Sequence, residues 1–143
     1  MKNLIIVLGL GLAVISCKKE DVKQKESIEA EVSTGTWKII SFIDSGVDET
    51  VHFAGYNFEF QDGGVLTASN GTNSYTGTWS VTDSNSNDDS PDDLDFNIYF
   101  NLTNDFQDLN DDWDITSHSS TTLELFDISG GNGGTDVLTF AKN

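Results

Sequence analysis

Apolar and polar residues alternate through most of this chain, and the alternation restricts it to β structure. Between residues 56 and 61, Tyr56, Phe58 and Phe60 are separated by single polar residues, which is the period of a strand with one buried face. No long stretch has the period of an amphipathic helix, and only residues 106–109 suggest one helical turn. The pattern predicts eight strands, at residues 36–43, 56–61, 65–68, 74–81, 94–100, 113–118, 122–125 and 138–140.

Short turns join most of these predicted strands. Gly63-Gly64 and Asn70-Gly71 are turn sequences. Strands joined by tight turns pair antiparallel, because parallel pairing needs a crossover of about a dozen residues or more. An open sheet would leave two unpaired edges, which closure removes. We therefore expect an all-β fold over residues 35–143: an eight-stranded antiparallel meander, closed as a barrel or a flattened barrel.

The first 17 residues have the features of an export signal. Lys2 is followed by an apolar run from Leu4 to Ile15, which is too short to span about 30 Å of hydrocarbon as a helix. The sequence Val14-Ile15-Ser16-Cys17 resembles the lipobox of bacterial lipoproteins. The resemblance implies a signal peptide over residues 1–16, cleavage before Cys17, and acyl chains on the thiol and the new amine of Cys17. An ordinary signal peptide with a chance cysteine is the alternative.

Residues 17–34 are expected to form the lipidated cysteine and a flexible linker, because they contain too few apolar residues to order themselves. The sequence Lys18-Lys19-Glu20-Asp21 resembles the surface-export signal of Bacteroidota lipoproteins. Its alternative is simply the solvated start of the linker. The expected location is the outer membrane, where the lipid anchor holds the protein on the periplasmic face or at the cell surface.

The charge of the chain excludes one class of partner and favours another. The 143 residues include seven lysines, no arginine and 24 acidic residues, for a net charge of −17. Nucleic-acid binding needs clustered basic residues and is therefore not expected. Residues 31–143 contain two lysines and 20 acidic residues, which gives them a net charge of −18. Such a domain would attract a cationic protein, for example lysozyme, at rates that fall with salt.

A short triplet carries a family resemblance. Gly35-Thr36-Trp37 opens the first predicted strand, Gly77-Thr78-Trp79 repeats the triplet, and the chain ends in a strand that includes Leu138–Lys142. This arrangement resembles the lipocalin-like domains of Bacteroidota lipoproteins, in which a tryptophan on the first strand packs across the closed end of the barrel. The chain departs from lipocalins in two respects: it has no arginine to pack over Trp37, and it has no room for a helix after the last strand.

The resemblance implies non-catalytic binding. Inward-facing aromatic residues would surround a small apolar pocket at the open end of the barrel, which is wide enough to hold one small ligand. The candidate ligand-binding residues are Trp37, Tyr56, Tyr75, Trp79 and Trp113. The alternative is a packed core without a cavity.

The loop of residues 83–93 is a candidate calcium site. Asp83, Asn85 and Asn87 match the first three ligand positions of an EF-hand loop, and Asp89 adds a carboxylate. Asp88 replaces the required glycine, however, and the flanking helices are missing from the pattern. A solvated acidic loop is the favoured alternative. A second acidic cluster surrounds Trp113, at residues 105–114. No other cofactor is expected.

The sequence contains no recognisable catalytic constellation. The single cysteine is assigned to the anchor, and His52 and His118 are the only two histidines that could serve as general bases. We therefore expect a protein that is not an enzyme. The leading hypothesis is an envelope lipoprotein that binds a small apolar ligand or an envelope partner. The alternative is an acidic surface lipoprotein that binds or inhibits a cationic protein.

Overall fold

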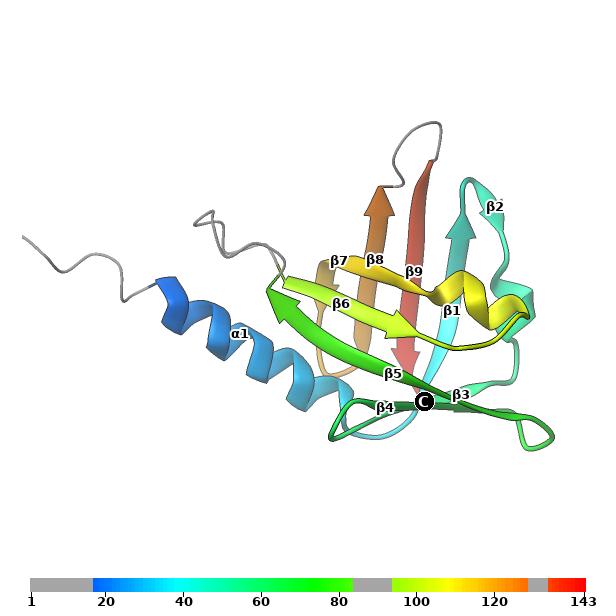
Figure 1. Cartoon of the computed structure of the whole chain (residues 1–143), viewed down its shortest axis with the longest axis horizontal. Helices are drawn as coiled ribbons and strands as arrows, with labels where there is room; N and C mark the ends of the chain where they lie inside the picture. The colour runs from blue at the N-terminus through cyan, green and yellow to red at the C-terminus, as the bar shows by residue number, and fades with distance from the viewer. Residues whose placement is uncertain (1–16, 84–93, 129–133) are drawn as a thin grey trace, which may run out of the picture.

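Eight strands close into an antiparallel barrel, as the alternation predicts (Figure 1). The computed structural model describes residues 17–83, 94–128 and 134–143. The barrel strands are β1 (Trp37–Asp44), β3 (Asn57–Gln61), β4 (Val65–Ser69), β5 (Ser74–Asp83), β6 (Leu94–Tyr99), β7 (Asp111–His118), β8 (Thr122–Ile128) and β9 (Thr135–Lys142). Consecutive strands pair from β3 to β9, and β1 closes the ring by pairing with both β9 and β3. All eight predicted strands are therefore confirmed, with small shifts at their ends.

The strand registers place the predicted apolar positions inside the barrel. Phe96 on β6 pairs with Trp113 on β7, and Leu125 on β8 pairs with Leu138 on β9. These four side chains are at most 1% exposed. Since cross-strand partners lie on the same face of a sheet, every strand contributes its apolar face to one core. The sequence did not predict β2 (Val47–Asp48), a short strand that extends β1 through a tight turn at Ser45-Gly46.

Two short helices cover one end of the barrel, which we call the mouth. They are the 3-10 helices η1 (Thr50–Phe53) and η2 (Asp105–Leu109), and η2 confirms the helical turn predicted at residues 106–109. The Asn104 side chain accepts a hydrogen bond from the Phe106 amide at 3.2 Å and so fixes the start of η2. Buried apolar side chains turn inward from both helices: Phe53, Phe106 and Leu109.

Phe106 is the centre of the aromatic packing at the mouth. Its ring centroid lies 4.8–6.0 Å from those of five other aromatic residues, Phe53, Tyr56, Phe58, Tyr75 and Phe100. Aromatic pairs in this distance range stabilise a core beyond the area that they bury. The mouth is therefore filled from η2 rather than left open.

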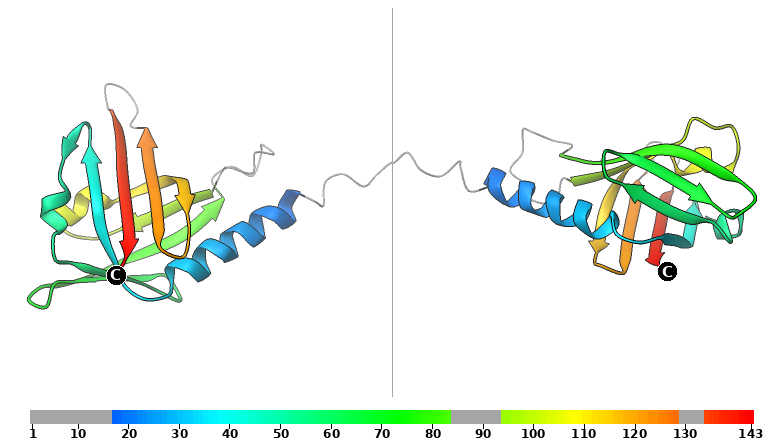
Figure 2. Two further views of the ribbon diagram at one scale, coloured as in Figure 1. Left: turned by 180° about the vertical axis from the view of Figure 1, so that it is seen from behind. Right: turned by 90° about the horizontal axis from the view of Figure 1, so that it is seen from below.

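The opposite end of the barrel carries a helix where a flexible linker was expected. Helix α1 (Cys17–Val32) runs up to the barrel and packs against it beside β5 (Figures 1 and 2). Residues 18–31 contain no glycine or proline and are rich in Lys, Glu and Gln, which favour helix. Ile28 and Val32, one turn apart, are 0% and 1% exposed. These two side chains bury the last turns of α1 against the barrel. Within the described residues, no helix is long and apolar enough to cross a membrane.

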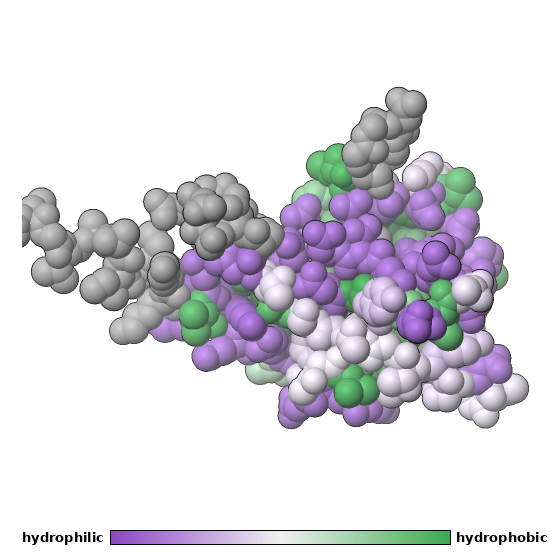
Figure 3. Space-filling model, in the orientation of Figure 1, coloured by the Kyte–Doolittle hydropathy of each residue, from purple (hydrophilic) through white to green (hydrophobic). Residues whose placement is uncertain are grey.

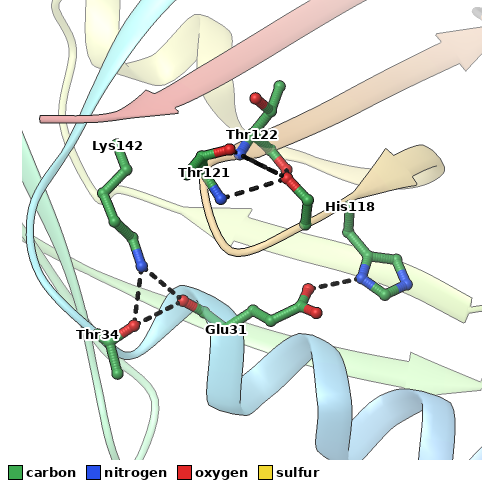
Figure 4. A network of polar contacts seen from close by, with 7 residues as sticks. Glu31, Thr34, His118, Thr121, Thr122 and Lys142 are labelled. Carbon is green, nitrogen blue, oxygen red and sulfur yellow. Dashed lines mark hydrogen bonds and ion pairs between the residues drawn. The ribbon is translucent and has the colours of Figure 1, made fainter.

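Polar contacts hold the end of α1 against three strands, and Figure 4 shows those that involve His118 and Lys142. The Trp37 indole on β1 donates a hydrogen bond to the Val32 carbonyl at 2.9 Å. The Glu31 carboxylate lies 2.7 Å from Nδ1 of His118 on β7. The Lys142 ammonium on β9 donates to the Glu31 carbonyl at 3.3 Å and also lies 4.8 Å from the centroid of the Trp37 ring. The helix is thus tied to β1, β7 and β9.

Gly77 shows why the repeated triplet needs its glycine. A Cβ atom at this position would lie 2.7 Å from Cδ1 of Phe100, and the Tyr99 carbonyl oxygen would be closer still. Any side chain would therefore push β5 away from β6 or displace Phe100 from the core.

We expect Phe106→Ala to lower the free energy of unfolding by about 3–5 kcal/mol, because it empties the centre of the mouth. Chemical denaturation followed by tryptophan fluorescence measures this loss. Phe106→Leu keeps more of the volume and should cost less, so it provides a folded variant if the alanine variant is too unstable. Gln107→Ala alters an exposed neighbour on η2 and serves as the control. A loss after Phe106→Ala no larger than that of the control would contradict the packing described.

Candidate functional site

The three tryptophans predicted to bind a ligand belong to the core. Trp37, Trp79 and Trp113 are 0%, 6% and 1% exposed. Each indole N–H donates to a backbone carbonyl, at 2.9 Å to Val32, 3.0 Å to Gln61 and 3.0 Å to Leu109, respectively. A buried indole whose N–H already has a partner is a structural group. The structure therefore gives these residues a packing role, and ligand binding by them stays a prediction.

The two predicted tyrosines lie together at the mouth. The rings of Tyr56 and Tyr75 stack with their centroids 6.0 Å apart, and both rings contact Phe106. The pKa of Tyr75 is raised above its ordinary value, mainly by hydrogen bonding to Tyr56 and to a lesser extent by burial. Tyr56 is 8% exposed and Tyr75 is only partly buried. Of the five predicted ligand residues, Tyr75 is thus the most accessible.

A groove of about 580 Å³ lies outside the barrel, between α1 and the outer face of β5 and β6. We call it the helix groove. Glu29 of α1 and Ser33, the residue after the helix, form one wall, and the β3–β4 turn at residues 62–64 contributes another. The floor consists of β5 and β6 residues, namely Thr78, Trp79, Ser80, Asn97 and Tyr99. Tyr99 exposes 56% of its surface, although its neighbours in the sequence, Ile98 and Phe100, are buried.

Backbone contacts hold the turn that borders the helix groove against its floor. The Trp79 amide donates to the Gly64 carbonyl at 3.0 Å, and the Trp79 indole reaches the Gln61 carbonyl just before the turn. Gly64 has a φ of +86°, and a Cβ atom there would lie 3.1 Å from the Trp79 carbonyl oxygen. Glycine is therefore needed for both the left-handed backbone and the close approach. This side of the groove is held in one position.

A second groove, of about 430 Å³, lies on the outer face of β3 and β4. Its lining is polar and includes Asn57, Glu59, Thr67 and Ser69. The last residue, Asn143, donates to the Asn57 side chain at 2.7 Å and to the Thr36 hydroxyl at 3.0 Å. In the space-filling view, the surface over β4 and β5 is pale, whereas the surface above it is strongly hydrophilic (Figure 3). The pale colour reflects the serines and threonines that β4 and β5 point outward.

The mouth carries a concentration of carboxylates, which we call the acidic mouth: Asp44, Asp108, Asp111, Asp127 and Asp136. Asp127 and Asp136 are cross-strand partners on β8 and β9, and Asp136 accepts a hydrogen bond from the Ser45 amide, next to Asp44, at 2.6 Å. The pKa of Asp108 is raised, mainly by partial burial and to a lesser extent by repulsion from Asp44 and Asp105. Ionisation of Asp108 in the acidic mouth therefore costs more free energy than ionisation of a fully exposed aspartate.

Asp111 is the carboxylate of the acidic mouth with the most strongly raised pKa. It pairs with the buried Ile98 and so faces the inside of the barrel. Burial, then a hydrogen bond with the Asp112 side chain, raises the pKa of Asp111 to about 6, and Asp127 contributes through repulsion. The Asp112 amide donates to Asp111 at 2.9 Å, which opposes the shift.

The calcium site predicted in the loop of residues 83–93 falls mostly outside the described residues. Asp83 ends β5 and is engaged in an interaction, whereas Asn85, Asn87 and Asp89 lie outside the part that the structure describes. Within the described ranges, no group of three or more His, Cys, Asp or Glu side chains is arranged to hold a metal ion. Calcium binding by residues 83–89 remains a prediction.

Both histidines have acidic neighbours. His52 of η1 lies 3.2 Å from Glu49 and 4.0 Å from Asp105, and His118 contacts Glu31. His52 and its two acidic neighbours lie on the surface near the acidic mouth, whereas the contact between His118 and Glu31 docks α1.

The helix groove is the feature that the sequence analysis missed. Alternation identified the inward positions of β5 and β6, but it assigned their outward positions only to solvent. A signal was nevertheless present: Ser74, Thr76, Thr78, Ser80 and Thr82 form an unbroken run of hydroxyl residues on the outer face of β5. Tyr99 on β6 stands opposite Thr78 on β5 and adds an exposed aromatic ring to this hydroxyl-rich face.

One solved structure has a similar fold. It is the crystal structure of a DUF4847 family protein from Bacteroides vulgatus, with a TM-score of 0.50 and 18% sequence identity. The similarity covers 81% of this chain and 97% of that chain. At this identity the likeness shows the fold alone, which is a small β-barrel domain. No protein-family model and no curated protein matches the chain.

We expect Asp111→Asn to stabilise the protein at neutral pH and to have little effect near pH 4. The folded protein binds the Asp111 proton more tightly than the unfolded chain does, so this carboxyl makes stability fall as the pH rises from about 4 through 6. The asparagine oxygen can still accept the Asp112 amide. Thermal unfolding from pH 4 to pH 8 measures the effect, with Glu59→Gln, an exposed charge on β3, as the control. Equal pH profiles for Asp111→Asn and the parent protein would refute the prediction.

Proposed function

We propose that this protein is a non-catalytic binding lipoprotein of the bacterial outer membrane, anchored through acyl chains on Cys17. Support for the anchor comes from the leader and the lipobox-like sequence that ends at Cys17. Several acyl chains are needed for a stable hold, because one chain gives only marginal membrane binding. The domain would lie on the periplasmic face or at the cell surface.

The observation that carries the proposal is the continuous helix from Cys17 to the barrel. Helix α1 begins at Cys17, and its last residue, Val32, is buried against Trp37. At about 1.5 Å per residue, 16 helical residues give a spacer of about 24 Å. The geometry supports a folded domain held at a defined distance from its anchor.

The lipocalin-like assignment is part of this proposal. The resemblance rests on Gly35-Thr36-Trp37, and the chain has no arginine to cover the tryptophan. Lys142 supplies a cation over the Trp37 ring at 4.8 Å, and α1 closes that end of the barrel before the first strand rather than after the last. Because aromatic side chains fill the mouth, we place the binding surface on the outside of the barrel, where the two grooves lie.

We expect Cys17→Ala to abolish incorporation of labelled palmitate and to release the protein from the outer-membrane fraction. The reason is that the thiol is the attachment point for the diacylglyceryl group. Ser16→Ala keeps a small residue before the cysteine and should remain labelled, which makes it the matched control. Mass spectrometry of the N-terminus separates a cleaved from an uncleaved leader. Equal labelling of Cys17→Ala and the parent would refute the anchor.

A second candidate function is binding of a cationic protein, and the acidic mouth favours it. Five carboxylates gather there, and two of them have raised pKa values. The lysines at positions 18, 19, 23 and 25 all belong to α1, at the other end of the domain. A positive surface could therefore approach the mouth without meeting them.

We expect immobilised full-length protein to capture lysozyme, used as a basic probe, at low ionic strength and to release it near 1 M salt, where the Debye length is about 3 Å. A combined Asp108→Asn and Asp111→Asn variant should capture less, because it removes two charges from the mouth. Glu124→Gln on β8 removes a charge elsewhere and should not. Capture that is insensitive to salt, or absent, would exclude this function and leave the anchor unaffected.

A further inference from the structure

The helix groove combines an exposed aromatic ring with fixed polar groups. Tyr99 exposes 56% of its surface on the floor of the groove, next to Thr78 on the neighbouring strand. An exposed tyrosine offers a flat apolar face together with a polar tip. Such a face packs against ligands that have an apolar side and hydroxyl groups around their edge.

Asn97 is held in one orientation beside this ring. Its Nδ2 donates to the Ser80 hydroxyl at 3.2 Å, the Ser80 carbonyl at 3.3 Å and the Thr82 hydroxyl at 2.8 Å. With the amide nitrogen engaged by β5, the amide oxygen points away from these partners. The hydroxyls of Thr78 and Ser80 can both donate and accept, so the floor can match the hydroxyl groups of a ligand in either role.

The charge of the groove restricts the ligand further. Glu29 of α1 and Asp62 of the β3–β4 turn stand on its walls, and none of the described residues that line it is basic. An anionic ligand would be repelled by these carboxylates. Carboxylates and hydroxyls are strong acceptors, and they suit a neutral ligand that brings many donors.

We propose that the helix groove binds a neutral carbohydrate, with Tyr99 stacked on the apolar face of a sugar ring and Asn97, Ser80 and Asp62 hydrogen-bonded to its hydroxyls. A volume of about 580 Å³ is within the usual range of ligand sites and can take a short oligosaccharide segment. This inference rests on the proposed function and names the ligand class of its outer surface.

The test is an array of neutral and acidic oligosaccharides probed with the detergent-solubilised full-length protein. We expect binding to a subset of the neutral oligosaccharides. Tyr99→Ala should weaken that binding at least tenfold, Tyr99→Phe should retain most of it, and Asn97→Ala should weaken it. Ile128→Ala removes another exposed apolar side chain, on β8 and away from the groove, and should bind like the parent.

Thermal unfolding of each variant shows whether a loss of binding reflects a loss of folding. Because Tyr99 is exposed, its replacement should leave the melting temperature close to that of the parent. The proposal is overturned if no neutral oligosaccharide binds, if only acidic oligosaccharides or a lysine-rich peptide bind, or if Tyr99→Ala binds as well as Ile128→Ala. None of these results would affect palmitate labelling of Cys17, so failure here is distinct from failure of the anchor.

Discussion

The hydrogen bond from the Trp37 indole to the Val32 carbonyl joins the helical and the β parts of this protein. Trp37 is fully buried, and it is also the residue where β1 pairs with both β9 and β3. The same residue therefore takes part in closing the barrel through its strand pairing, while its side chain receives the end of α1 and lies under the Lys142 ammonium. Because one residue serves three contacts, the orientation of α1 and the closure of the barrel are coupled.

The barrel was predictable because strands with one buried face have a period that a sequence displays directly. Tyr56, Phe58 and Phe60 illustrate this, and all three are buried as expected. Helix α1 was not predictable in the same way. Its stability depends on Ile28, Val32 and the contacts of Glu31 with distant strands, so a local count of apolar residues underestimated it. The capping helix η1 was missed for a related reason, since its single buried residue, Phe53, makes no periodic pattern.

The candidate site was predictable only in part. Sequence patterns located the aromatic residues correctly but could not show that η2 carries Phe106 into the space between them. Whether a small barrel is hollow depends on what its loops insert, and alternation within strands holds no information about that. The helix groove depends on how α1 and the β3–β4 turn lie against β5, which is a matter of tertiary packing. The outer face of β5 and β6 therefore became a candidate surface only with the structure.

The docked end of α1 has a consequence for movement at a membrane. A disordered tether lets a domain tumble, so that every face meets the lipid surface in turn. A helix fastened at its barrel end would instead confine any pivoting to the junction with the proposed lipid anchor, and the helix and barrel would then swing as one body at a nearly constant distance from that junction. Under the proposed anchor, the mouth and the two grooves would keep fixed positions relative to the helix as the domain pivots, and the directions from which a partner can approach would be restricted accordingly.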